Sequence, residues 1–159
     1  MIRGLKWRNW NAFRALLAVR FPEQFSGLGS LQTIRDALEE APWEFPAKTP
    51  IVMPDELDEA DPRSLQAIIL DCEVPAAAQW LTIAASVIMG YTRLNEEDQG
   101  GKDLYDSDLW KAKGSLMFNA KRWDFWKKRL TNIQFLDVAD LTKKDAASAL
   151  AAMEQVTAS

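Results

Sequence analysis

The longest apolar stretch of the chain covers residues 74–91, VPAAAQWLTIAASVIMGY, and contains no charged side chain. As an α-helix it would span about 27 Å, since each residue adds about 1.5 Å. Pro75 suits its first turn, and Gly90 suits its C-terminal end. Apolar residues cover most of the circumference, so the pattern predicts a central helix at about residues 74–92, with other helices packed on several sides.

Three neutral polar residues of this helix, Gln79, Thr82 and Ser86, fall on one face because they are spaced i, i+3 and i+7. A face in bulk water usually carries Lys or Glu, whereas neutral groups suit partial burial beside hydrogen-bond partners. The stripe has two interpretations: its groups bond to neighbouring backbone or water, or they line an internal pocket. The same residues argue against a membrane span, for which about eighteen residues is near the lower limit.

Apolar residues at helical spacing predict further helices around this one, at residues 2–21, 30–40, 62–72, 119–136 and from Thr142 onward. In the first of them, Trp10, Phe13 and Leu17 recur on one face, with Trp7 and Leu16 beside it. We expect this face to point into the core. The sequence thus predicts an all-α fold, a single-domain helical bundle over residues 1–159.

The helix expected at residues 119–136 separates apolar from basic positions. Its apolar face comprises Trp123, Trp126, Leu130 and Ile133. Helical spacing places the five basic residues of 121–129 on the opposite side, so we expect them to face outward.

Side chains suited to N-terminal capping occur before several of these helices. Ser30 would cap the helix of residues 30–40, and Asn119 would cap the helix of residues 119–136. Thr142 and Asp145 imitate a capping box. The last helix then offers an Ala-rich face for close packing, formed by Ala146, Ala149, Leu150 and Met153.

Residues 41–62 hold five of the seven prolines, which disfavours regular secondary structure. We expect an ordered, Pro-rich loop across the bundle surface, with Trp43 and Phe45 anchoring it. Five acidic residues follow between Asp55 and Asp61. Their spacing lacks the glycine turn of a calcium loop, so a solvated loop is expected rather than a metal site.

Histidine is absent from the chain, and Cys72 is its single cysteine. The usual general base and the commonest metal ligand are therefore missing, which excludes Ser-His-Asp, Cys-His and His-based zinc centres. We expect no cofactor and no metal. Any catalysis would rest on carboxylates, Tyr, Lys, the thiol or shape alone.

The net charge of −4 is unevenly distributed. Residues 1–36 carry six basic and two acidic groups (+4), residues 37–110 four and sixteen (−12), and residues 111–159 nine and five (+4). Opposite charges favour attraction within one compact fold. The acidic residues 55–61 or the basic residues 121–129 could also contact a protein partner.

A cytoplasmic location is expected, because no signal-peptide pattern occurs. The first helix is rich in Arg and has no acidic residue before Glu23. It therefore also resembles a mitochondrial presequence or a helix on a membrane surface. We expect it to dock on the bundle instead.

Several segments together resemble those of a known family: WNAFRALL, LQTIRDALEE, VPAAAQWLTIA, a later Gly-Gly pair and Leu-Trp pair, and KRWDFWKKRL. The chain is similar to a family of small α-helical fungal proteins with a domain of unknown function. The similarity spans most of the chain and lies mainly in aromatic and Ala positions. It implies a shared fold and assigns no catalytic residue.

The seven tryptophans support a functional hypothesis, because buried indoles need hydrogen-bond partners and their faces can line a pocket. We expect a small-molecule-binding protein, and within that class a cofactor-independent cyclase or isomerase that preorganises an apolar substrate. The resemblance implies a fungal biosynthetic role. Gln79 is the candidate for polarising a carbonyl. The candidate ligand-binding residues are Trp80, Thr82, Ile83, Ser86, Tyr91, Trp110, Trp123 and Trp126.

Two other classes of function remain open. A non-enzymatic protein-protein interaction module needs no pocket and would use the acidic or the basic segment. A binder of single-stranded nucleic acid would use residues 121–129, where basic and aromatic residues alternate. Helical spacing sorts those residues onto different faces, so we expect nucleic acid least of the three partners.

Overall fold

The structure is a computed structural model that describes residues 2–24, 27–40, 65–94, 109–110 and 118–158. Within these ranges all regular structure is helical. The elements are α1 (Ile2–Arg20), the short 3₁₀ helix η1 (Pro22–Gln24), α2 (Leu28–Leu38), α3 (Leu65–Ile83), α4 (Ala85–Leu94), α5 (Ala120–Ile133) and α6 (Asp140–Thr157). The prediction of an all-α bundle is confirmed. The Pro-rich loop expected at residues 41–62 lies outside the described residues.

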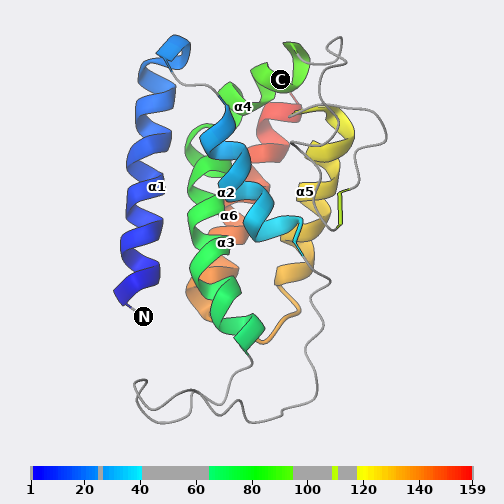
Figure 1. Cartoon of the computed structure of the whole chain (residues 1–159). Coiled ribbons are helices and arrows are strands. Elements are labelled where there is room, and N and C mark those ends of the chain that lie inside the picture. Colours follow the sequence, from blue (N-terminus) through cyan, green and yellow to red (C-terminus); the bar gives the residue numbers. More distant parts are fainter. Residues whose placement is uncertain (1, 25–26, 41–64, 95–108, 111–117, 159) are drawn as a thin grey trace.

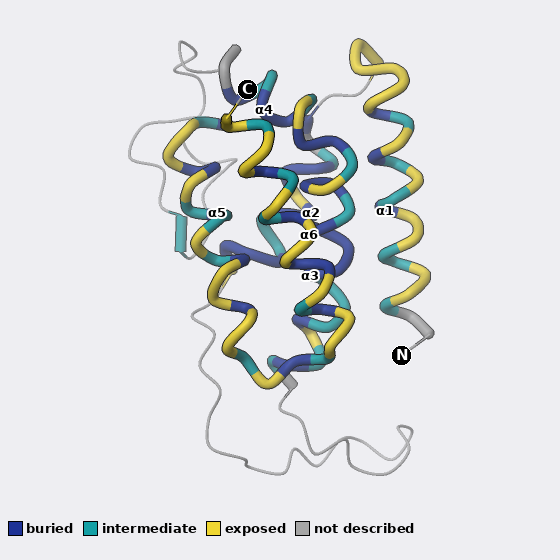
Figure 2. The backbone as a smooth tube through the Cα atoms, turned by 180° about the vertical axis from the view of Figure 1, so that it is seen from behind, coloured by how far each residue is buried: buried dark blue, intermediate teal, exposed yellow. Residues whose placement is uncertain are grey.

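α3 occupies the middle of the bundle and packs against α1, α2 and α6, while α5 packs against α6 (Figure 1). α1, α3 and α6 run in one direction, and α2 and α5 run in the opposite one. α1 stands at the edge, and no other described helix covers its outer side (Figures 1 and 2). Because α3 has neighbours on several sides, it can be apolar around most of its circumference.

The central helix starts earlier than the sequence predicts. α3 begins at Leu65, absorbs the separate helix expected at residues 62–72, and carries Pro75 in its interior rather than in its first turn. A proline inside a helix costs about 3 kcal/mol, because a hydrogen bond is lost and the ring clashes with the preceding turn. Val74 and Ala76–Ala78 are completely buried. Packing on several sides therefore outweighs the local preference of proline.

The predicted helix also breaks near its middle. α3 ends at Ile83, α4 begins at Ala85, and the two helices are bent by 81° relative to each other. Neither Gly nor Pro occupies the break, so its position could not be read from the usual helix breakers. The bend lays α4 across one end of the bundle, where Ile88 and Met89 are buried (Figure 1).

In the part of the chain that the structure describes, no single helix is long and apolar enough to cross a membrane. α3 and α4 meet that test of length and composition only as a pair, across their bend.

α1 forms as predicted but turns a different face to the core. Ala15 and Ala18 are buried, whereas Trp10, Phe13 and Leu16 are 53%, 51% and 57% exposed. The expectation that these three large residues pack inside is therefore wrong. Trp7 and Leu17, the other two residues assigned to that face, are half-buried.

Small residues explain the orientation of α1. A Cβ atom added at Gly4 would lie 3.4 Å from the Sγ of Cys72 on α3, so the two backbones approach closely at this point. Ala15 and Ala18 continue the same inner side. Large aromatic side chains there would hold the helices apart, because the interaxial distance depends on the side chains at the contact.

The predicted inner faces of α5 and α6 are confirmed, and α2 likewise buries apolar residues at helical spacing. The buried residues are Leu31, Ile34 and Leu38 on α2, Trp123, Trp126, Leu130 and Ile133 on α5, and Ala146, Ala149 and Met153 on α6, with Leu150 half-buried. Each of these helices has one apolar stripe, so periodicity alone identifies the inner side.

Helix capping follows the prediction only for α5, where Oδ1 of Asn119 accepts the backbone N–H of Arg122 at 2.8 Å. Ser30 lies inside α2, and its hydroxyl donates to the carbonyl of Gly27 instead. The start of α6 is bound by Asp71 of α3, whose Oδ1 accepts from the hydroxyl of Thr142 and from the preceding backbone N–H of Ala139. A carboxylate distant in sequence thus replaces the local capping box.

Two neighbouring positions on α1 test its orientation. Ala15→Leu should lower the free energy of unfolding by about 1–3 kcal/mol, because added methylene groups overpack a fully buried position. Leu16→Ala should change it by less than about 0.5 kcal/mol, because this side chain is exposed. Urea unfolding followed by circular dichroism measures both. The reverse order of effects would mean that the other face of α1 packs on α3.

Candidate functional site

The polar stripe of the central helix does not line an interior space. Thr82 and Ser86 are exposed, and Gln79 is half-buried. Nε2 of Gln79 donates to Oδ2 of Asp145 on α6 at 3.4 Å. The internal-pocket interpretation of this stripe is therefore wrong, because two of its three residues face solvent.

Asp145 joins three helices. Arg8 of α1 donates to it through both Nε (2.5 Å) and Nη2 (3.1 Å), and Gln79 of α3 adds a third contact. Hydrogen bonding to Asp145 raises the pKa of Arg8. The amide that was the candidate for polarising a carbonyl is thus engaged in a contact between helices.

Trp80 lies on another side of α3, at the interface with α1. Its Nε1 donates to Oδ1 of Asn11 at 2.8 Å, and the hydroxyl of Thr33 donates to the same oxygen at 3.3 Å. Nδ2 of Asn11 in turn donates to the carbonyl of Trp7. The guanidinium of Arg14 lies over the Trp80 ring, 5.5 Å from its centroid. Asn11 is completely buried, so it links α1, α2 and α3, a role that periodicity did not reveal.

A buried ion pair connects the end of α2 to the start of α5. Nε and Nη2 of Arg122 donate to Oε1 and Oε2 of Glu39, both at 2.6 Å. Both side chains are 0% exposed. Nε1 of Trp126 also donates to Oε1 of Glu39 at 2.6 Å. Burial removes both charges from water, which costs hydration free energy. The bidentate hydrogen bonds and the third donor, Trp126, offset that cost.

Aromatic rings surround this ion pair. The guanidinium of Arg122 lies 5.8 Å from the ring centroid of Trp110 and 5.9 Å from that of Trp126. Phe118 packs edge-on against Trp126, and Tyr91 packs against Phe118, with centroid distances of 6.1 and 5.6 Å. Burial raises the pKa of Tyr91. We call these five residues together with Glu39 the Arg122 cluster.

The predicted site residues therefore divide into separate places. Tyr91, Trp110 and Trp126 belong to the Arg122 cluster, and Trp123 adjoins it at 6.4 Å from Trp126. Nε1 of Trp123 donates to the hydroxyl of Thr157. The remaining candidates lie on other sides of α3 and α4: Gln79, Trp80, Thr82, Ile83 and Ser86.

The indoles that are hydrogen-bonded in this way use their N–H groups within the protein. Trp80, Trp123 and Trp126 donate to Asn11, Thr157 and Glu39 respectively. The abundance of tryptophan, which favoured a ligand pocket at the level of sequence, thus has a structural explanation at three of the predicted positions.

The basic segment 121–129 does not face outward as a whole. Arg122 is buried in the ion pair, and Nε of Arg129 donates to the carbonyl of Leu38 at 2.8 Å. Burial lowers the pKa of Arg129 to about 10. Lys121 and Lys128 are exposed. The prediction of an outward basic face is wrong for Arg122, and the surface it would offer to nucleic acid shrinks accordingly.

Burial affects two carboxyl groups, Glu73 on α3 and Asp36 on α2. Desolvation raises the pKa of Glu73, although donation from Nε1 of Trp7 at 3.1 Å opposes the change. Desolvation likewise raises the pKa of Asp36, against the effects of Arg35 and of the donated hydrogen bond from Gln32. Both groups have a neutral donor, which is typical of structural contacts between or along helices.

Metal binding has no support within the described ranges, where no group of three or more His, Cys, Asp and Glu residues could hold an ion. The acidic residues 55–61, considered as a contact for a protein partner, lie outside the described residues.

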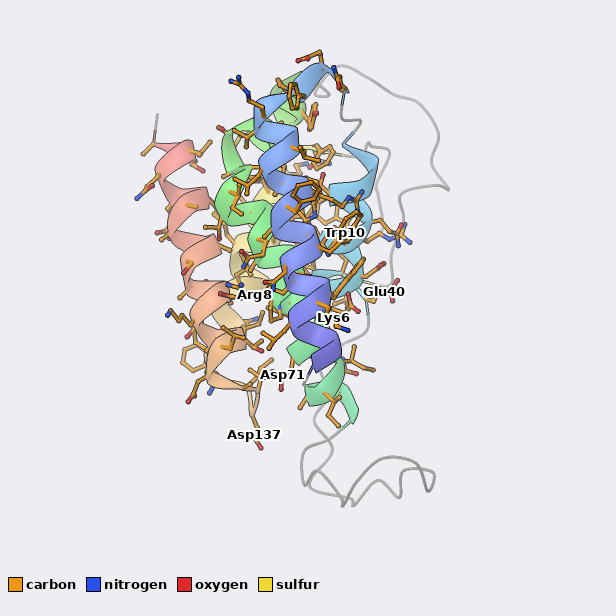
Figure 3. The ribbon with its side chains drawn as sticks, turned by 90° about the vertical axis from the view of Figure 1, so that its left-hand side faces the viewer. Lys6, Arg8, Trp10, Glu40, Asp71 and Asp137 are labelled. Carbon is orange, nitrogen blue, oxygen red and sulfur yellow. The ribbon has the colours of Figure 1, made fainter. Side chains whose placement is uncertain are left out.

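Among the residues that the structure describes, the largest group of exposed apolar side chains lies on and next to α1, where the sequence predicted a buried face. We call it the outer face of α1; its large exposed side chains are Leu5, Trp10, Phe13, Leu16, Val19 and, just after the helix, Phe21. The rings of Trp10 and Phe13 contact each other, with centroids 6.0 Å apart. In Figure 3 this helix stands in front of the bundle, with Trp10 and Lys6 on one side and Arg8 on the side toward α6.

The Arg122 cluster yields a stability prediction. Glu39→Ala should lower the free energy of unfolding by about 3–5 kcal/mol, because it leaves the buried charge of Arg122 without its partner. The double variant Glu39→Leu with Arg122→Met should recover at least about 2 kcal/mol of that loss, since it removes both charges and keeps apolar volume. Urea unfolding measures both. A double variant as unstable as Glu39→Ala would show that packing, rather than charge compensation, sets the cost.

Comparison with known proteins supplies a family and no activity. No curated protein matches the chain, and no solved structure matches it. One family matches residues 3–130, which include α1 to most of α5, and its description is a protein of unknown function. α6 lies beyond the matched residues, although Ala146, Ala149 and Met153 complete the core. The chain belongs to this family of proteins of unknown function, DUF3632.

Proposed function

We propose that this protein is a non-enzymatic binding module that docks through the outer face of α1. The observation that carries the proposal is the exposure of six large apolar side chains on and next to one helix. Single exposed apolar residues are ordinary, whereas a contiguous apolar patch is typical of an interaction site.

The inner side of α1 explains why this surface belongs to the folded protein. Ala15 and Ala18 are buried against the bundle, and Arg8 is bound to Asp145. The helix is therefore held in one orientation by packing and by an ion pair. Its exposed aromatic side chains are presented on a firm support, which lowers the entropy cost of binding.

The buried polar groups support the same proposal. Glu39 is bound by Arg122, Asp145 by Arg8, and Asp71 by Thr142. Carboxylates engaged in this way hold helices together. They are poorly placed to act as general acids or bases, which need access to a substrate proton.

An interaction module was also one of the functions considered from the sequence, but the proposed contact surface is a different one. The two segments expected to make the contact were residues 55–61 and 121–129. In place of them, α1 offers aromatic and aliphatic side chains, the residue types that dominate the buried centre of interfaces.

Cysteine labelling tests whether the outer face of α1 is covered in cells. In a Cys72→Ser background, Phe13→Cys should react with a membrane-permeant maleimide freely in the purified protein, because position 13 is exposed. In intact cells its labelling rate should fall at least about threefold, a conservative value for a site whose access is blocked by a bound partner. The measurement is the labelled fraction against time.

The matched control is Ala147→Cys, at an exposed position on α6. Its labelling rate relative to the purified protein should be unaffected in cells. Equal rates for positions 13 and 147 in cells would contradict the proposed docking face.

A second candidate function has one observation in its favour. Tyr91, Trp110 and Trp126, three residues predicted to bind a ligand, converge in the Arg122 cluster. Aromatic faces next to polar groups are the usual lining of a small-molecule site. On this hypothesis the protein binds an apolar small molecule there, and a cofactor-independent cyclase or isomerase of fungal metabolism is its most specific form.

Mass spectrometry of the purified protein tests this second candidate. A small molecule bound at the Arg122 cluster should copurify with the wild-type protein and be at least about tenfold depleted in Trp110→Ala, which removes one wall of the site. Trp10→Ala, which removes an exposed indole on α1, serves as the control and should retain it. Equal retention in both variants would place the ligand elsewhere. If no small molecule copurifies with the wild-type protein, the second candidate is contradicted and the binding module remains as the proposed function.

A further inference from the structure

We infer that the outer face of α1 docks on the surface of an anionic lipid membrane. The inference rests on the proposed function and names the class of partner for the same surface. The contact is peripheral: α1 lies along the lipid headgroups, and the rest of the bundle stays outside the membrane.

The charge of α1 favours an anionic partner. Between Ile2 and Arg20 the helix contains no acidic residue. Lys6 and Arg20 are exposed near its two ends, whereas Arg8 is neutralised by Asp145. These two positive charges therefore lie among the exposed apolar residues, near both ends of the outer face of α1, where they can reach lipid phosphates by extending their long side chains.

The same charge argues against a second copy of this chain as the partner. A symmetric contact would place one outer face of α1 on another, and Lys6 and Arg20 would meet only basic residues of that helix. The nearest acidic residues along the chain belong to other elements: Glu23 lies in η1, and Asp36 lies in α2. α1 itself thus presents only positive charge.

The width of the apolar surface favours a flat partner over a single helix. From Val19 through Leu5, Leu16 and Phe13 to Trp10, the exposed apolar positions span about half of the circumference at roughly 100° per residue, an arc that also holds the exposed residues Asn9, Lys6 and Arg20. A helix packed alongside α1 covers a stripe of about 100°. A membrane interface covers a wider arc, because its acyl boundary adapts to the whole exposed side of the helix.

The residue types agree with that environment. Trp10, Phe13 and Phe21 are aromatic, and tryptophan in particular is enriched where lipid headgroups meet acyl chains. Leu5 and Leu16 add aliphatic surface along the same helix. A helix with such residues on one side, and with Lys and Arg beside them, is typical of proteins that lie in the plane of the membrane surface.

Co-sedimentation with vesicles tests the inference on the full chain. One vesicle preparation contains phosphatidylcholine with about 30 mol% phosphatidylserine and the other phosphatidylcholine alone, in about 0.1 M salt. The protein should partition onto the anionic vesicles at least about tenfold more strongly, because two exposed basic side chains act in the same direction.

Two pairs of α1 substitutions separate the apolar from the electrostatic contribution. Trp10→Ser with Phe13→Ser should reduce partitioning at least about tenfold, because two large apolar side chains no longer enter the interface. Lys6→Gln with Arg20→Gln should reduce it about tenfold on anionic vesicles and leave neutral vesicles unaffected. All four positions are exposed, so the fold should be retained, as circular dichroism can verify.

Matched controls use the same chemistry on other surfaces. Lys121→Gln with Lys128→Gln removes two exposed charges from α5. Phe135→Ser removes a side chain that is 84% exposed between α5 and α6. Both controls should bind anionic vesicles within about twofold of the wild type. Substitutions at exposed sites outside the contact usually change a free energy by less than about 0.5 kcal/mol.

The outcomes distinguish the inference from the proposed function. Loss of binding in the α1 variants alone supports both. If the wild type binds neither vesicle, or if the controls weaken binding as much as the α1 variants, the inference is overturned. Should position 13 then still be protected from labelling in cells, the partner is a protein and the binding module stands. Without protection, both proposals fall.

Discussion

The buried pair of Glu39 and Arg122 is the interaction on which much of this structure depends. It joins residues 83 positions apart, at the end of α2 and the start of α5, and both side chains are fully buried. An unpaired charge in such a place would cost several kcal/mol, so the two helices are constrained to meet there. The indoles of Trp110 and Trp126 pack on the guanidinium as a result. What resembles an aromatic site is thus first of all a connection between helices.

The functional proposals follow from how the interior uses its polar groups. Asp145, Asn11 and Glu39 each serve two or more helices, and the indoles of Trp80 and Trp126 serve two of these groups. A core organised in this way holds the shape of the bundle. The chemistry available to a partner then lies on the outside, where α1 exposes large apolar residues beside basic ones.

The sequence predicts the buried face correctly where a helix has a single apolar stripe. The prediction failed where two faces of the same helix could both pack against the core. On α5 the spacing of Trp123 and Trp126 identified the inner side, and burial confirms it. On α1 the pattern selected the largest residues, Trp10 and Phe13, although the small residue Ala15 faces the core. Large apolar residues dominate a periodic pattern, whereas two helices can pack closely only where the side chains between them are small. The signal that could have revealed the inner side is the run of Gly4, Asn11, Ala15 and Ala18, in which one polar residue accompanies small ones.

The sequence by itself determined the helical class, the apolar character of the centre and the absence of histidine chemistry, because these depend on composition and on local spacing. It also contained the family relationship that the match over residues 3–130 shows. Only the tertiary structure decided that α3 continues through Pro75, that Arg122 is buried, and that the aromatic residues of α1 face outward. Those outcomes depend on which helices surround a residue and which charges meet in the fold. Contacts between segments distant in sequence set them, and these can outweigh local preferences by several kcal/mol.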